Sequence, residues 1–90
     1  MKNIEILLYV RDMIGEEDEP TTWPTYRQIV EEIKRVEKWD FKEFAKRTDN
    51  KLSSRLVGLA EEGLLERKYI HAAMRYALTE KGKRLCAKFD

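Results

Sequence analysis

Apolar and polar residues follow helical spacing over most of the chain and strand spacing over one stretch near its end. Residues 3–14 carry two apolar stripes on opposite sides of a helix: Ile4, Leu7, Leu8 and Ile14 form one, and Ile6, Tyr9, Val10 and Met13 form the other. A surface helix needs only one such stripe, so we expect both sides of this helix to be covered. A second subunit is the simpler cover, and the alternative is a central helix wrapped by its own chain.

The first alternative predicts a homodimer held by this helix and by the last helix of the chain. Its contacts would be Ile6, Tyr9, Val10, Met13, Cys86 and Phe89. Cys86 is most simply a small apolar residue of the last helix. At a two-fold interface it would face its symmetry mate, where an intersubunit disulfide becomes a further hypothesis.

Residues 15–24 interrupt this pattern with a glycine, four consecutive acids and two prolines, which predicts a solvated loop. A helix follows over residues 25–37, begun by a capping box of Thr25 and Gln28. Asp40 and Glu43 predict a second capping box, with Trp39 packing across it onto a phenylalanine. The short helix that this box begins is expected to end near Thr48.

A further helix is predicted over residues 50–62, capped by Asp49 or Asn50 and ended by Gly63. Its core-facing stripe is Leu52, Leu56 and Leu59. Two segments with strand character follow, residues 64–70 and 75–79, joined by a loop His-Ala-Ala-Met. A last helix is expected over residues 80–90, capped by Thr79. The fold class is therefore mainly α with a small β-hairpin, an α+β fold in one domain over residues 1–90.

Charge is distributed unevenly along the chain, although the formal net charge is only +1. Residues 1–20 carry a net charge of −4, residues 21–50 carry +1, and residues 51–90 carry +4. Residues 50–60 contain no acid at all. Such a chain can present a basic face without a basic total.

The acid-free helix is expected to turn an unusual surface outward. With its leucines facing the core, the far side carries Asn50, Lys51, Ser54, Val57 and Gly58, and the flanks carry Ser53 and Arg55. Amides and hydroxyls bind base edges or phosphate, cations bind phosphate, and an arginine can bind guanine with two hydrogen bonds. A mid-helix glycine costs about 1 kcal/mol relative to alanine, which a close approach by nucleic acid or by a packing helix would justify. The alternative is that this face is an ordinary solvated helix surface with no binding role.

Three segments, FKEFAKR, LSSRLVGLAEEGLLERK and RYALTEKGKRL, resemble the winged helix-turn-helix transcriptional regulators of the HxlR and MarR groups, of small archaeal or archaeal-virus type. The resemblance covers residues 41–85 and implies a helix-turn-helix over residues 41–63 and a wing over residues 64–79. A weaker similarity makes residues 25–37 the preceding core helix. The first helix of the pair is either residues 41–47 or residues 26–36.

This resemblance and the residue pattern together predict a dimeric regulator that binds double-stranded DNA, with residues 50–62 in the major groove. The expected DNA contacts are Lys46, Arg47, Asn50, Lys51, Ser53, Ser54, Arg55, Arg67, Lys68 and Arg75. Half-sites about 34–36 Å apart would match a two-fold dimer. His71 is expected to be a solvent-exposed wing residue. The hairpin cations also suit a solvated edge protected from strand pairing.

Other classes of function find little support in the chain. A single cysteine and a single histidine do not suit a zinc site, and we find no catalytic arrangement, glycine-rich nucleotide loop or ligand pocket signal. We therefore expect no enzyme activity, metal, cofactor or membrane partner, and a cytoplasmic location. Lys, Arg and Glu far outnumber Asn and Gln, as in thermophilic proteins. The rival hypothesis is a winged-helix adaptor that binds protein within a replication or transcription assembly.

Overall fold

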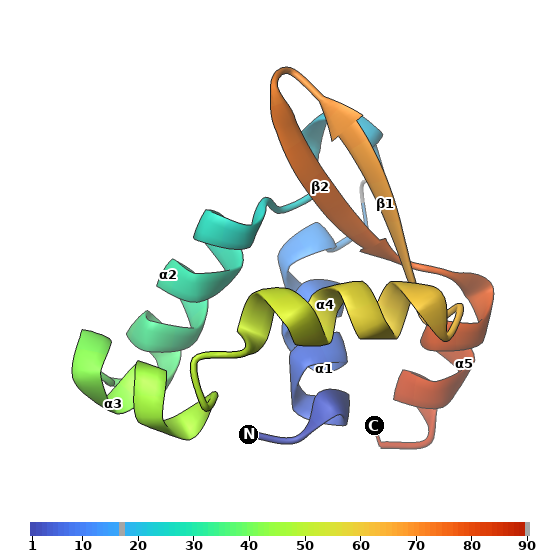
Figure 1. The fold of residues 1–90 in the computed structure, drawn as a ribbon. Coiled ribbons are helices and arrows are strands. Elements are labelled where there is room, and N and C mark those ends of the chain that lie inside the picture. Colours follow the sequence, from blue (N-terminus) through green and yellow to red (C-terminus); the bar gives the residue numbers. More distant parts are fainter. Residues whose placement is uncertain (17, 90) are drawn as a thin grey trace.

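The computed structural model describes residues 1–16 and 18–89, and in them the chain forms an α+β fold of five α-helices and one antiparallel hairpin (Figure 1). The elements in order are α1 (Asn3–Ile14), a 3-10 turn η1 (Pro20–Thr22), α2 (Tyr26–Glu37), α3 (Phe41–Arg47), α4 (Leu52–Glu61), β1 (Leu65–Ile70), β2 (Ala73–Leu78) and α5 (Glu80–Ala87). The predicted succession of four helices, a hairpin and a last helix is confirmed, although α5 ends three residues early.

Helix α1 lies at the centre of the molecule, behind α4 in Figure 1, and packs against α2, α5 and β2. Ile6 and Val10 are completely buried, and Cys86 is 1% exposed. The prediction that these three residues contact a second subunit is therefore wrong, because the chain itself covers both stripes of the helix. Tyr9 and Met13 pack partly buried against the same core, and Phe89 is exposed. The homodimer itself stays a prediction without these three contacts.

The leucine stripe of α4 enters the core as predicted, with Leu52, Leu56 and Leu59 at most 2% exposed. Gly63 ends this helix in a left-handed conformation, with a φ of 78°. Its N–H donates to Ala60 O, and Leu64 N–H donates to Leu59 O at 2.9 Å. These two bonds form a Schellman motif, which satisfies the last carbonyls of α4 and turns the chain into β1.

Helix starts follow local capping chemistry. Thr25 and Gln28 form the predicted capping box at the start of α2, with both reciprocal hydrogen bonds present. At α3, only half of the predicted box forms: Asp40 Oδ1 accepts from Glu43 N–H at 2.8 Å. The Glu43 carboxylate instead accepts from Arg47 Nε at 2.6 Å, one turn further along the helix.

The turn of the hairpin is tighter than predicted. Ile70 pairs with Ala73, so the connection is the two residues His71 and Ala72 and not the four-residue loop His-Ala-Ala-Met. Both turn residues have φ between 54° and 58°, the left-handed region that a type I′ turn needs at both positions. This turn could not be predicted from the sequence, because neither residue is glycine, asparagine or aspartate.

One side of the hairpin is braced by the segment before α2. Trp23 is 5% exposed and Pro24 is also buried, so residues 15–24 are not the wholly solvated loop that was predicted. Tyr76 N–H donates to Pro24 O at 3.0 Å, and Thr25 forms an isolated bridge with Arg75. Tyr76 and Leu78 are buried, and Ala77 between them is buried as well.

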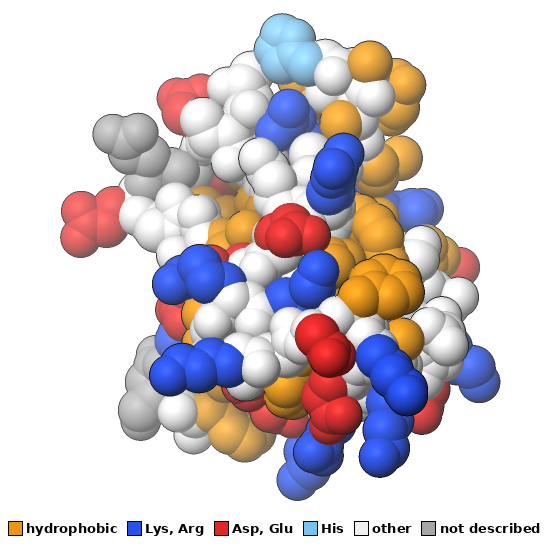
Figure 2. All heavy atoms as spheres, turned by 90° about the vertical axis from the view of Figure 1, so that its left-hand side faces the viewer, with side chains coloured by type: hydrophobic (Ala, Val, Ile, Leu, Met, Phe, Trp, Pro, Cys, Tyr) orange, Lys and Arg blue, Asp and Glu red, His pale blue; other side chains and the backbone are white. Residues whose placement is uncertain are grey.

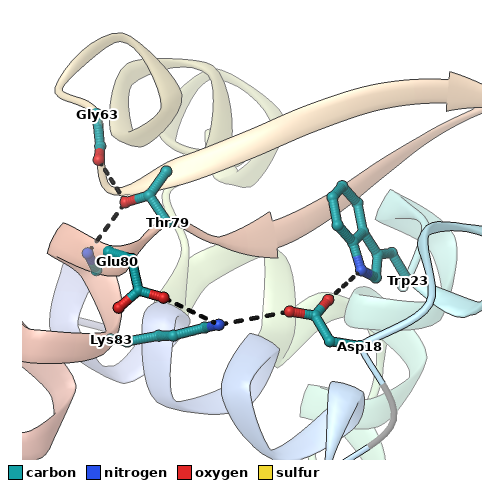
Figure 3. Close-up of polar contacts among 7 residues, drawn as sticks. Asp18, Trp23, Gly63, Thr79, Glu80 and Lys83 are labelled. Carbon is teal, nitrogen blue, oxygen red and sulfur yellow. Dashed lines mark hydrogen bonds and ion pairs between the residues drawn. The ribbon is translucent and has the colours of Figure 1, made fainter.

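The hairpin is joined to α5 by Thr79, whose hydroxyl makes two hydrogen bonds (Figure 3). It donates to Gly63 O at 2.6 Å and accepts from Gly82 N–H at 3.1 Å, which caps α5 as predicted. A Cβ at Gly82 would lie far inside van der Waals distance of Leu64 O. This threonine and this glycine therefore fix α5 against the junction of α4 and β1.

Candidate nucleic-acid interface

The turn between α3 and α4 consists of Thr48, Asp49, Asn50 and Lys51. Asp49 and Asn50 both have left-handed φ values, of 54° and 55°, and Asn50 N–H donates to Ala45 O at 2.9 Å. These two residues therefore end α3 and do not cap α4, which corrects the prediction. Thr48 is buried and donates its hydroxyl to Phe44 O at 2.9 Å, which ties the turn to the core. Lys51 occupies the N-cap position without a side-chain cap hydrogen bond.

The outward face of α4 is polar and open in its first turns. Asn50, Lys51, Ser53 and Ser54 are all exposed. Gly58 is half-buried, and a Cβ there would meet nothing within 4 Å. Packing among the described residues therefore does not require a glycine at this position. Four of the predicted surface residues are therefore accessible, whereas Arg55, Val57 and Gly58 are half-buried.

Arg55 lies at the side of this face and is half-buried. Its Nε donates to Asn3 Oδ1 at 2.9 Å, which links α4 to the start of α1. This arginine therefore has a structural partner in the chain, and the predicted bidentate contact to a base would require that hydrogen bond to break.

The three hairpin cations differ in their surroundings. Arg67 is exposed on β1. Lys68 is exposed too, lies 3.7 Å from Glu66 Oε1 and stands 5.3 Å from the centre of the Trp23 ring. Arg75 is half-buried, and its guanidinium donates to Trp23 O at 3.0 Å and to Ile70 O at 3.3 Å. Arg75 was predicted as a DNA contact, but these bonds make it a brace between the hairpin and the segment before α2.

The two cations at the end of α3 also separate. Lys46 is exposed, whereas Arg47 is held by Glu43 and stands 5.9 Å from the centre of the Trp39 ring. Among residues 1–16 and 18–89, no ion pair includes Lys46, Lys51 or Arg67. Three of the predicted cations thus keep their charge unpaired on the surface near α4 and β1.

Exposed aromatic residues are the feature that sequence reasoning missed. Tyr69 and Phe41 are each 70% exposed and Tyr26 is 40% exposed. Tyr26 and Phe41 border a groove of about 340 Å³ between α2, α3 and the turn, lined also by Val30, Phe44 and Asn50. Figure 2 shows this side of the molecule, where hydrophobic side chains lie among Lys, Arg, Asp and Glu side chains. The exposure of Phe41 could have been predicted from the sequence, because the apolar pattern assigned this residue no position in the core.

The groups with shifted pKa values lie away from this face, on α1 and α2. Burial raises the pKa of Tyr9 to about 12, helped by the carboxylate of Glu37 beside it. The hydrogen bond from Arg35 lowers the pKa of the half-buried Glu32 carboxyl. Within the described part of the chain, no three His, Cys, Asp or Glu side chains are grouped to hold a metal ion.

Comparisons with protein-family models, with curated proteins and with solved structures found no match to this chain. Within residues 1–16 and 18–89, none of the helices has the length and apolar character needed to span a membrane.

Proposed function

We propose that the chain is a winged helix-turn-helix domain that binds double-stranded DNA and acts as a transcriptional regulator. In this proposal α3, the turn at Asp49 and Asn50, and α4 are the helix-turn-helix, and β1 and β2 are the wing. The single observation that carries it is the accessible, acid-free start of α4, together with Lys51 and Arg67, which are exposed and form no ion pair within the described residues.

The proposal rests on fewer residues than the ten DNA contacts expected from the sequence. Asn50, Lys51, Ser53 and Ser54 would enter the major groove, where amide, ammonium and hydroxyl groups bind base edges and phosphate. Lys46 and Arg67 would bind phosphates on either side. Arg47, Arg55 and Arg75 already bond within the chain, so we assign them to support this surface.

Salt-dependent binding to a labelled duplex tests this proposal. We expect affinity to fall steeply with salt, and Lys51→Ala with Arg67→Ala to lower the slope of log affinity against log salt by about 2, since each lost phosphate contact removes about 1. The matched control is Arg84→Ala with Lys88→Ala, which removes two exposed cations from the C-terminal part of the chain. Equal losses in both double variants would contradict the proposed interface.

A second function, docking on another protein, is favoured by the apolar groove between α2 and α3. Two exposed aromatic rings beside a groove are typical of protein interfaces. An adaptor would bind duplex DNA weakly, without dependence on sequence. Its partner affinity would fall with Phe41→Ala and stay unchanged with Lys51→Ala.

A further inference from the structure

On the outer half of the hairpin, one face carries two exposed apolar side chains. In the register of the two strands, Tyr69 lies opposite Met74, next to the Ile70–Ala73 pair that adjoins the turn. Tyr69 is 70% exposed and Met74 is 37% exposed. Residues two apart on a strand share a face, so Arg67 lies on the same side as Tyr69.

Trp23 lies against the opposite face. Lys68 and Arg75, which pair across the hairpin, both contact Trp23, through the aromatic ring and the carbonyl respectively. These contacts with Trp23 fix the position of the hairpin, and Tyr69 and Met74 on its other face stay exposed. On their own face, Tyr76 and Leu78 are buried nearer the base of the hairpin, where the sheet meets the helices.

The chemistry of this face matches one kind of partner. A tyrosine beside a methionine makes a favourable cross-strand pair, which alone would stabilise the hairpin. That role does not require both side chains to stay exposed beside an unpaired arginine. A polyanion with flat apolar surfaces between its charges fits all three side chains at once, and a DNA base step has this form. Arg67 would bind phosphate while the apolar pair contacts the bases.

We propose that Tyr69 and Met74 form an apolar wedge that enters the minor groove, partly unstacks one base step and bends the duplex. This inference rests on the proposed DNA-binding function and adds the kind of site that is preferred. Wedges of this type kink DNA at their point of entry. Pyrimidine–purine steps such as TpA unstack with least cost, whereas A-tracts resist deformation. The preferred duplex therefore carries a flexible step where the hairpin lies.

Two duplexes of equal length test the wedge, one rich in TpA steps and one made of A-tracts. Affinity is measured by fluorescence anisotropy, and bending by energy transfer between dyes at the two ends. The wild-type chain is expected to prefer and bend the TpA-rich duplex. Tyr69→Ala with Met74→Ala should lower that affinity about tenfold and abolish the bend. Its salt slope should stay unchanged, because no cation has been removed.

Two further variants separate the wedge from a loss of folding. Tyr69→Phe keeps the aromatic face and should bind and bend as the wild type does. Val36→Ala trims another exposed apolar side chain, outside the hairpin, and should change neither quantity. Circular dichroism of the double variant should show a folded chain with a thermal midpoint close to that of the wild type.

The outcomes distinguish the wedge from the function on which it rests. A wild-type chain that binds no duplex overturns both. A chain that binds duplex with a steep salt slope, yet bends it equally with and without the Tyr69–Met74 pair, overturns the wedge alone. Tighter binding to single strands than to either duplex also overturns the wedge, because the pair would then stack on unpaired bases.

Discussion

At the residue scale, two glycines of this chain have opposite surroundings. A Cβ at Gly58 would meet nothing, whereas a Cβ at Gly82 would collide with the Leu64 carbonyl. Gly58 is thus unexplained by packing within the chain, and its conformational cost suits a close approach by DNA.

Gly58→Ala is expected to raise the free energy of unfolding by about 1 kcal/mol, because alanine favours the helix. Urea unfolding measures this change. If α4 enters the major groove, the added methyl should also weaken duplex binding. A stabilised variant with unchanged DNA affinity would place Gly58 outside the interface.

Gly82→Ala is the contrasting variant. It is expected to lower the free energy of unfolding by about 2 kcal/mol or more, because α5 must shift away from the Leu64 carbonyl. Urea unfolding shows whether the free energy of unfolding rises or falls. A neutral result would mean that α5 moves without strain.

Tyr9 gives a prediction at high pH. Its pKa is raised to about 12 by burial beside Glu37, whereas an unfolded tyrosine titrates near pH 10. The folded chain therefore holds this proton more tightly, and the stability gained is complete below about pH 10 and lost as pH rises through 12. The stability advantage of the wild type over Tyr9→Phe should shrink across this interval in urea unfolding at a series of pH values. A constant difference would contradict the raised pKa.

At the element scale, the sequence predicts what local chemistry determines. The leucine spacing, the Thr25–Gln28 box and Gly63 each act within a few residues, and all three were confirmed. The roles of Arg55 and Arg75 depend on Asn3 and Trp23, each 52 residues away, so no local pattern indicated them. The exposed start of α4 thus remains part of the candidate site. Three predicted cations, Arg47, Arg55 and Arg75, instead form contacts within the chain.

The hairpin turn is an element whose residues do not suit its geometry. His71 and Ala72 both adopt left-handed conformations, which cost side-chain-bearing residues about 1 kcal/mol each. His71→Asn with Ala72→Gly should therefore raise the thermal midpoint, with a gain in stability of about 1 kcal/mol. A lowered midpoint would show that the turn differs from type I′.

At the scale of the whole molecule, the position of α1 decides how subunits can associate. Val10 is completely buried in the protomer, so Val10→Asp should lower the free energy of unfolding by about 3 kcal/mol or more through an unpaired buried charge. Circular dichroism measures whether the variant is folded, and sedimentation measures its oligomeric state. Together they distinguish a role of Val10 in the core from a role at a subunit interface. A folded monomeric variant derived from a dimeric wild type would instead support a subunit interface at α1.

The loop that carries Asp18 has a consequence for the approach to a partner. Asp18 accepts from Trp23 Nε1 and pairs with Lys83, and the loop lies behind the hairpin while α4 lies in front (Figures 1 and 3). The acidic loop before α2 and the acid-free start of α4 therefore lie on different sides of the molecule, and this separation of charge should give the nearly neutral chain an electric dipole. A diffusing molecule near a duplex should rotate before contact so that its acidic end trails. Added salt should then slow association more than it speeds dissociation.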